Sequence, residues 1–280
     1  MSIIAGIFRA LPLFKGKERL ARVFFKERVK HDKDILIQGK FHCKYLVPNI
    51  VENIGFEIFI NGIYEEETSD FIAKKLPPGG VFLDLGANIG AIAIPVFKKR
   101  NDIRIVCVEA APWIFNYLKQ NLYLNKMDNA IALNMALLDQ DETKVNFYSP
   151  IDKFGKGSLS PIFTNNKVEI NSIQVDTLLK NYNIEKVDFI KIDVEGFEFS
   201  VFKGAKELFT RNDAPDIIFE FVDWAESQAS GNYVGSSQKI LLDFGYKIYL
   251  FKANGEMEEL KSILKKGFSM LYATKNGMKH

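Results

Sequence analysis

The sequence contains little cysteine, little histidine and no long apolar run, and each shortage argues against a class of protein. Its 280 residues include two cysteines, Cys43 and Cys107, far apart in the chain. This argues against a disulfide framework and against a cysteine-rich zinc site. No run approaches the roughly 18 apolar residues that a membrane-spanning helix needs, and the first residues lack the pattern of a secretory signal. We therefore expect a cytoplasmic protein.

Hydrophobic residues make up 47% of the chain and charged residues 26%, which is typical of one globular domain with at most a modest extension. The net charge is +2, but residues 1–44 carry eleven Lys or Arg against four Asp or Glu. Between Ile3 and Phe24 apolar residues recur at helical spacing among these basic residues. We expect a basic helix packed on the core, with contact to an anionic membrane surface or a lipid-linked substrate as the alternative.

The pattern of short apolar runs predicts the order of the elements. Residues 34–63 alternate in short runs broken by glycine and proline, which predicts a small β meander ending in a strand at Phe56–Ile60. Further strands are expected at residues 81–85, 103–109, 130–136, 187–193, 216–221, 246–251 and 268–274. Helices are expected near residues 66–75, 89–99, 113–124, 175–182 and 197–209, with a polar one around 257–264. Alternating strands and helices predict an α/β fold, with a mostly parallel sheet covered by helices on both faces.

The most informative segment is a glycine-containing turn after a buried strand. Residues 81–85 read as that strand, and Gly86, Asn88 and Gly90 follow before a helix. Glycines let the backbone turn sharply and approach a ligand, at the sheet edge where open α/β sheets bind their ligands. The spacing is neither that of a dinucleotide fold nor that of a nucleotide triphosphate loop. Asp84 ends the strand and either binds a ligand or caps the turn.

An acidic residue follows the next strand at the position where it can bind both hydroxyls of a ribose. This residue is Glu109, 19 residues after Gly90. Asp84-x-Gly86-x-Asn88-x-Gly90 followed by Glu109 resembles the first two motifs of class I S-adenosylmethionine-dependent methyltransferases. The resemblance implies that the glycine turn holds the methionine moiety and that Glu109 binds the ribose.

Further segments resemble one branch of that class, the FkbM-type methyltransferases. They are Gly62-Ile63-Tyr64-Glu65, Asn121, Ala136-Leu137-Leu138-Asp139, Val175-Asp176-Thr177-Leu178, Ile190-Lys191-Ile192-Asp193-Val194-Glu195-Gly196-x-Glu198 and Gly204-Ala205. One departure is Asp141-Glu142-Thr143, where such sequences more often place a glycine. The resemblance implies a Rossmann-like seven-stranded sheet in residues 61–280, after an N-terminal helix and meander in residues 1–60. It also implies methyl transfer, usually to a hydroxyl oxygen of a sugar or natural product.

The resemblance also implies a set of residues for binding S-adenosylmethionine. These are Glu65, Asp84, Gly86, Asn88, Gly90, Glu109, Ala136, Leu137 and Asp193. For Glu65, contact with the cofactor as part of a lid and simple placement at a helix N-terminus remain equal alternatives.

Carboxylates rather than histidines are placed for the chemistry. The three histidines, His31, His42 and His280, lie away from the ends of the predicted core strands. Asp193 and Glu195 follow the fourth strand of the predicted sheet, and the fifth ends in Glu220, so all three are expected near the cofactor. We predict Asp193, Glu195 and Lys191 as catalytic residues and no metal site.

The roles within this group stay open. Asp193 can deprotonate the acceptor, bind the methionine ammonium or, less favoured, hold a divalent cation. Lys191 lies two residues before Asp193 and so on the same face of the strand. A lysine in an apolar strand needs a partner, so it either pairs with a carboxylate or stabilises the developing alkoxide.

The acceptor-binding residues are the part of the site that the sequence indicates least clearly. A long polar stretch at Ser149–Asn171, Trp224 and residues 227–237 are assigned to recognition of a hydroxylated small molecule or glycan. Methylation of an amine or of RNA would use the same cofactor site, and a non-catalytic binding module that retains the fold is the third alternative. DNA is not expected as a partner, because the base-methylation signature is absent and the main domain is acidic.

Overall fold

The computed structural model describes residues 6, 8–9, 11, 16–229, 233–252 and 255–277. Ile3, Ile4, Ile7, Lys15 and His280, together with residues 230–232 of the predicted acceptor loop, lie outside this part of the chain.

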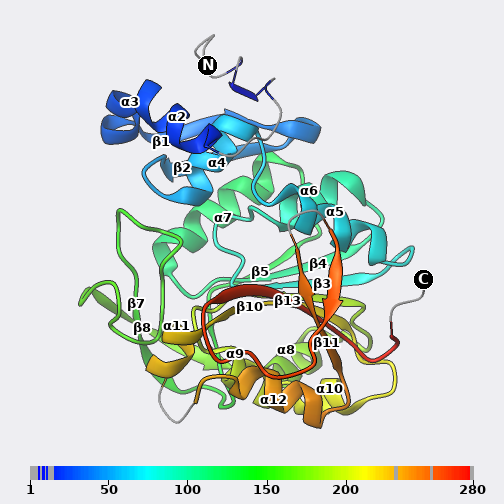
Figure 1. Cartoon of the computed structure of the whole chain (residues 1–280). Helices are drawn as coiled ribbons and strands as arrows, with labels where there is room; N and C mark the ends of the chain where they lie inside the picture. Colours follow the sequence, from blue (N-terminus) through cyan, green and yellow to red (C-terminus); the bar gives the residue numbers. More distant parts are fainter. Residues whose placement is uncertain are drawn as a thin grey trace.

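The core is one twisted sheet with the strand order β12-β11-β13-β10-β9-β3-β4-β5 (Figure 1). Five strands run parallel: β3 (Val81–Leu85), β4 (Arg104–Val108), β5 (Ile131–Leu133), β9 (Phe189–Ile192) and β10 (Asp216–Val222). The strand β13 (Phe268–Thr274) inserts antiparallel between β10 and β11 (Lys247–Phe251). All seven predicted strands are present, and the Rossmann-like α/β fold is confirmed.

An eighth strand corrects the prediction of a polar helix around residues 257–264. Met257–Glu259 form the edge strand β12, which pairs antiparallel with β11. The chain reverses between the two strands, with Gly255 at φ +78°. Backbone pairing with the open edge of β11 outweighs the weak helical pattern of this short segment.

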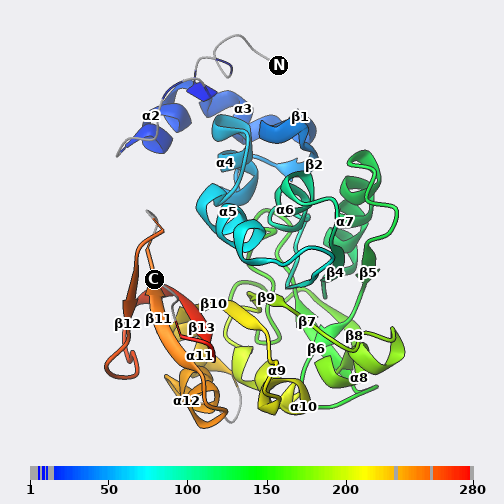
Figure 2. The same cartoon turned by 90° about the vertical axis from the view of Figure 1, so that its right-hand side faces the viewer.

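Helices cover both faces of the sheet, which Figure 2 shows as separate layers. One face carries α5 (Glu66–Lys75), α6 (Ala93–Lys99) and α7 (Pro112–Leu124). The other carries α8 (Val175–Asn181), α9 (Glu198–Lys203), α10 (Lys206–Thr210) and α12 (Ser236–Asp243); α11 (Asp223–Gln228) follows β10. Neighbouring strand residues serve opposite faces, since Phe82 packs in the first core and Leu83 in the second. A sheet buried on both faces explains the continuous apolar runs of its strands.

The N-terminal region forms a separate layer beyond α5, α6 and α7 (Figure 2). The strands β1 (Lys33–Gln38) and β2 (Lys44–Asn49) pair antiparallel, and a 3₁₀ turn at Lys40–His42 joins them. The expected third strand of the meander is instead the helix α4 (Asn53–Asn61), so that prediction is wrong. Its residues Phe56 and Ile58–Ile60 are all buried. A helix buried around most of its circumference lacks the apolar stripe that would distinguish it from a buried strand.

Asn121 of α7 joins the N-terminal layer to the glycine turn. Its side-chain oxygen accepts a hydrogen bond from the Leu46 amide at 2.6 Å. Its amide nitrogen donates to the Leu46 carbonyl at 3.1 Å and to the Ile89 carbonyl at 2.9 Å. The side chain is fully buried, so these bonds satisfy a polar group that would otherwise be costly.

The basic N-terminal helices pack on α4 through their inner side. Ala21 of α2 (Lys17–Phe24) is buried, and the ring of Phe25, before α3 (Lys26–His31), meets the Phe59 ring edge-on at 4.9 Å. The helices therefore pack on α4, but through Ala21 and Phe25 and not through Leu20, Val23 and Phe24 of the predicted apolar stripe. The outer side of α2 nevertheless leaves apolar side chains exposed, with Phe24 at 63% and Val23 at 72%. Within the described residues, no helix is long and apolar enough to cross a membrane.

A small sheet at the side of the core shortens the predicted polar loop. It has the order β6-β8-β7, formed by β6 (Ala136–Leu137), β8 (Lys167–Ile173) and β7 (Lys144–Tyr148). Residues 167–171 therefore belong to β8, and the loop spans residues 149–166. Asp141 accepts hydrogen bonds from the Gln174 amide at 2.7 Å and the Thr177 hydroxyl at 2.7 Å. An acid is thus useful at this turn, where the family more often has glycine.

Candidate active site

The glycine turn after β3 is held against the end of β9. Gly86 has φ +81° and Gly90 has φ +84°, backbone conformations that favour glycine, and Asn88 adopts φ +52°. A Cβ atom on Gly86 would lie 1.9 Å from the carbonyl oxygen of Asp193. The close contact between the turn and the Asp193 backbone therefore requires glycine at position 86.

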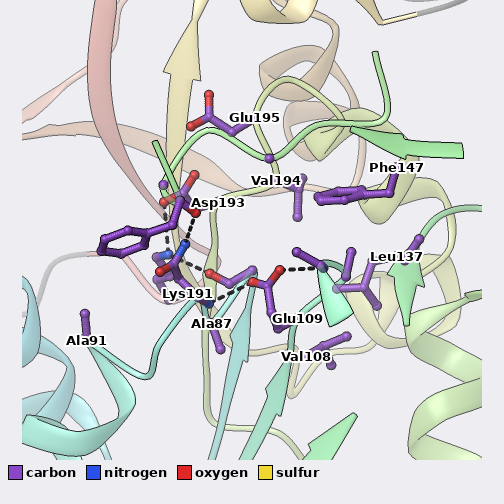
Figure 3. Close-up of a pocket in the computed structure, with 18 of the residues that line it drawn as sticks. Ala87, Ala91, Val108, Glu109, Leu137, Phe147, Lys191, Asp193, Val194 and Glu195 are labelled. Atoms are coloured by element: carbon purple, nitrogen blue, oxygen red, sulfur yellow. Dashed lines mark hydrogen bonds and ion pairs between the residues drawn. The ribbon is translucent and has the colours of Figure 1, made fainter. Parts of the chain in front are cut away.

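Glu109, directly after β4, binds the backbone of the same turn. Its carboxylate accepts hydrogen bonds from the Asn88 amide at 2.9 Å and the Ala111 amide at 2.7 Å (Figure 3). Burial raises the pKa of this carboxyl to about 7, although both hydrogen bonds favour the charged form. Each carboxylate oxygen keeps a further lone pair for a ligand hydroxyl. Glu109 therefore shapes the turn, and its contact with ribose stays a prediction.

Lys191 stands at the centre of the site, near the carboxylates of Asp193 and Asp84. The parallel pairing of β3 and β9 places it beside Asp84. Its ammonium lies 3.1 Å from Asp193 Oδ2 and 4.0 Å from Asp84 Oδ1. Burial alone would lower the pKa of Lys191, but the neighbouring carboxylates raise this pKa by more than burial lowers it. The net shift is upward, and the lysine stays charged. The expected pairing with Asp193 is present. Burial raises the pKa of Asp84 to about 6.

Three carboxylates gather beyond Lys191. Asp193, Glu195 and Glu220 each bring one carboxylate oxygen within 4.8 Å of the others; we call them the carboxylate cluster. Burial and mutual repulsion raise the pKa of Glu195 and of Glu220. Lys156 of the 149–166 loop lies 3.0 Å from Glu195 Oε1 and supplies a positive charge there. Hard oxygen ligands at this spacing could also hold a divalent cation, but the sequence-based expectation of no metal site stays a prediction.

Glu65, directly before α5, lies near enough to Lys191 for the lysine charge to act on its carboxyl. It occupies the N-cap position with φ +42°, yet its side chain makes no capping hydrogen bond. Burial raises the pKa of this carboxyl, and the charge of Lys191 opposes the shift. A non-glycine residue in this strained conformation needs support from its surroundings. Glu65 is therefore not a simple helix cap, and its contact with the cofactor as part of a lid stays a prediction.

Glu198 shapes the turn after β9 rather than the cavity. Its carboxylate accepts hydrogen bonds from the Val194 amide at 3.2 Å and the Gly196 amide at 3.4 Å. Burial raises the pKa of this carboxyl to about 8. Gly196, at φ +97°, passes so close to the backbone of Ala225 that a Cβ atom would lie 2.4 Å from the Ala225 carbonyl oxygen. The Asp-Val-Glu-Gly motif is therefore a turn that presents Asp193 and Glu195.

The structure brings most of the predicted site residues to one cavity (Figure 3). Those that line it are Gly86, Asn88, Glu109, Ala136, Leu137, Lys191, Asp193 and Glu195. Asp84, Gly90 and Glu65 do not line it: Asp84 lies beneath Lys191, the Gly90 amide closes the turn by donating to the Ala87 carbonyl, and Glu65 lies near Lys191. His31 and His42 are exposed and outside the cavity.

Residues of the 149–166 loop line this cavity. The sequence assigns this stretch to acceptor recognition, and that role stays a prediction. Phe154, Gly155 and Gly157 line the cavity beside the glycine turn. Phe154 is buried, and its carbonyl accepts a hydrogen bond from the Asn88 side chain at 2.9 Å. Phe154 is therefore a buried anchor of the loop. Its contact with the glycine turn joins residues 66 positions apart in the chain, so no local pattern in the sequence signals it.

Removing the Glu220 charge should change the pH dependence of stability. Its folded-state pKa is raised above the ordinary 4.5, so its contribution to stability is full below about pH 4.5 and is lost as pH rises through the folded pKa. Glu220→Gln mimics the neutral acid, and its melting temperature should exceed that of the wild type increasingly above pH 5. Thermal denaturation at pH 5, 7 and 9 measures this, with exposed Glu185→Gln as control. A constant difference across these pH values would contradict the assignment.

Comparison with the profiles of known protein families identifies the family of this chain. The profile of the methyltransferase FkbM domain matches residues 84–248, more than half of the sequence. The chain belongs to the FkbM methyltransferase family. The match begins at the end of β3 and runs through the carboxylate cluster into β11. This FkbM-family chain is a methyltransferase that uses S-adenosylmethionine. A buried acid after β4 and a glycine where the turn meets the end of β9 fit that cofactor.

Two individual relatives are also named as methyltransferases. Methyltransferase sdnD of Sordaria araneosa is 25% identical over 178 residues, covering 52% of this chain and 68% of that protein. Methyltransferase 1 of Beauveria bassiana is 26% identical over 175 residues, covering 55% and 67%. Among solved structures, a precorrin-6y C5,15-methyltransferase from Geobacter metallireducens matches with a TM-score of 0.44 at 13% identity, covering 75% of this chain and 87% of that one.

Removing the Glu109 carboxylate should weaken cofactor binding. Glu109→Ala frees the Asn88 and Ala111 amides and removes the predicted ribose acceptor, so we expect at least a tenfold loss of affinity for S-adenosylmethionine. Titration calorimetry measures the affinity, and circular dichroism checks the fold. Glu142→Ala is the control, because Glu142 is exposed and does not line the cavity. Unchanged affinity in a folded Glu109→Ala protein would remove the ribose assignment.

Proposed function

We propose that this methyltransferase transfers the methyl group to a hydroxyl oxygen of a glycan, glycolipid or natural-product acceptor. The observation that carries the proposal is the carboxylate cluster beside the cofactor cavity, with buried Lys191 against Asp193. A hydroxyl must lose its proton to become a good nucleophile, and a carboxylate of raised pKa is suited to take it. Glu195 has that property, and Asp193 lies beside Lys191. The pKa of Glu220 is raised further, to about 9, so this carboxyl is largely protonated at neutral pH and is less suited to take the proton.

In the proposed reaction, each residue of the site has a separate role. The acceptor oxygen forms a bond to the methyl carbon as the carbon–sulfur bond breaks, and the hydroxyl proton passes to a carboxylate of the cluster. Asp193 is held by Lys191 and orients the hydroxyl, while Glu195 is held by Lys156. Because the displacement is in line, alignment and exclusion of water supply much of the acceleration. The buried loop anchor Phe154 serves that exclusion.

Amine methylation is a second candidate, because three carboxylates also suit an ammonium group. RNA is less favoured, since the same carboxylates would repel its phosphates. A non-catalytic module would have no need for Lys191 and Lys156, each ion-paired to a carboxylate at the cavity.

A screen with matched acceptors tests the proposed function. The purified chain is incubated with S-adenosylmethionine carrying a ¹³C-labelled methyl group and with sugars, glycolipids and polyols, each beside its amino analogue. Formation of S-adenosylhomocysteine measures turnover, and the ¹³C shift of the product distinguishes an O-methyl from an N-methyl group. We expect O-methyl products. N-methyl products alone would replace the proposal with the amine alternative, and binding without any turnover would favour the module.

We further propose that the outer side of α2 contacts an anionic membrane surface. Leu20, Val23 and Phe24 are exposed there, and Arg19 and Lys26 flank them. Apolar side chains within a basic surface suit an interface of anionic lipids. Sedimentation with phosphatidylserine vesicles should pull down the wild type and lose Val23→Ser/Phe24→Ser, while phosphatidylcholine vesicles bind neither. Equal sedimentation of both proteins with the anionic vesicles would reject the contact.

A further inference from the structure

A second groove lies on the far side of Glu65 from the cofactor cavity. It has a volume of about 380 Å³, and its lining includes Glu65, Thr68, Phe251, Lys252, Phe268 and Met270. We call it the β11–β13 groove, since the ends of these strands form one wall and the first turn of α5 the other. The volume lies within the range of small-molecule sites. The groove shares no lining residue with the cofactor cavity.

The groove has a fixed wall, because α5 packs tightly on the two strands. The Phe71 ring of α5 meets the rings of Phe251 and Tyr272, both at 5.1 Å. These contacts lie below the groove on the same sheet face. A ligand could therefore enter without the wall having to form around it, which lowers the cost of binding.

The groove adjoins the carboxylate cluster. In the ladder between β10 and β13, Met270 lies directly opposite Glu220. Opposite residues of an antiparallel pair share one face of the sheet. Met270, which lines the groove, therefore lies next to Glu220 on that face. From the other wall, Glu65 lines the groove and interacts electrostatically with Lys191 and Asp193. A molecule in the groove thus has its inner end next to the reacting groups.

The side chains of the groove suit an apolar ligand with a polar inner end. Phe251, Phe268 and Met270 supply apolar surface, and Phe268 is 64% exposed. The polar lining comes from Thr68, Ser269, Glu67 and Glu65. The Oε2 atom of Glu65 is buried without a hydrogen-bond partner. Lys252 at the outer end is paired with Glu258 at 3.2 Å, so it adds little net charge. An unpaired buried carboxylate oxygen can accept a ligand hydroxyl.

We propose that the β11–β13 groove binds the apolar portion of an amphiphilic acceptor, an alkyl or aryl aglycone, while a hydroxyl of the attached polar portion reaches the carboxylate cluster. This inference rests on the proposed O-methyltransferase function and narrows its acceptor class. A free sugar would leave the apolar wall unused, whereas an alkyl glycoside fills both parts. Affinity should rise roughly threefold to fourfold for each methylene that the groove buries.

Binding of two glucosides to the full-length protein tests the groove. The probes are methyl β-D-glucoside and n-octyl β-D-glucoside, the latter below its micelle concentration, with S-adenosylhomocysteine present. Titration calorimetry should give at least tenfold tighter binding of the octyl compound. Phe268→Ser, at an exposed position, should remove that advantage and leave S-adenosylhomocysteine affinity unchanged. Tyr123→Ser, an exposed aromatic residue on α7, should keep the advantage.

The outcomes separate the groove from the proposed function. Equal affinity for the two glucosides, no octyl binding, or an octyl advantage that survives Phe268→Ser would overturn the groove assignment. Octyl binding that depends on Phe268 supports it even when the acceptor screen yields no O-methyl product, because calorimetry does not require turnover. The absence of an O-methyl product in the screen would instead count against the proposed O-methyl transfer.

Discussion

Gly86→Ala should abolish binding of S-adenosylmethionine and lower the stability of the protein. A Cβ atom there would lie 1.9 Å from the Asp193 carbonyl oxygen, and both contacting groups are backbone or attached directly to it. Neither can rotate away, so β3 and β9 would have to separate at the cofactor edge. The alanine would also be strained at φ +81°. We expect at least a hundredfold loss of cofactor affinity by calorimetry, with a lower melting temperature.

Gly79→Ala is the matched control for this prediction. Gly79 also has a positive φ, +70°, but no atom lies within 4 Å of the added Cβ. It therefore carries a similar backbone strain, about 1–2 kcal/mol, without the clash. Gly79→Ala should lower stability modestly and keep cofactor affinity. Similar behaviour of the two variants would mean that strain alone, and not the contact with Asp193, explains the glycine.

Asp193→Asn should reduce turnover by 10²- to 10⁴-fold with little change of the fold. The substitution keeps the shape of the side chain and removes the charge that pairs with Lys191 and accepts the hydroxyl proton or orients the hydroxyl. Steady-state kinetics with an acceptor from the matched screen should show the loss in kcat. Asp152→Asn, exposed in the neighbouring loop, is the control.

A near-normal rate for Asp193→Asn would mean that Asp193 is neither the base nor an essential positioning residue. The proton would then have to pass to Glu195 or Glu220. Glu195→Gln and Glu220→Gln, measured in the same assay, distinguish these two carboxylates from each other.

The sheet and its cofactor edge could be predicted because their signals are local. Each core strand is an apolar run bounded by polar or glycine residues, and Glu109 and Asp193 follow their strands directly. Once the strands are parallel, their carboxyl ends meet at one edge, and the site follows from the chain order. The Lys191–Asp193 pair likewise followed from the strand period of two.

The remaining features depend on contacts between distant segments. The helix α4 is buried around most of its surface, so its sequence lacks the stripe that identifies a helix. Lys156 meets Glu195, 39 residues later in the chain, and nothing near either residue signals the pair. The β11–β13 groove exists because β13 inserts beside β10 and brings residues around 250–270 to Glu65. No local sequence pattern indicates either the Lys156–Glu195 ion pair or the contact that forms the groove.

A crystal structure of the protein with S-adenosylhomocysteine would test the central claim most directly. We predict the ribose hydroxyls on the Glu109 carboxylate, the methionine part against the turn at Gly86, and the sulfur facing Asp193, Glu195 and Glu220. A cofactor bound with its sulfur turned away from these three carboxylates, or with its adenine among them, would contradict the assignment of the carboxylate cluster to the methyl acceptor.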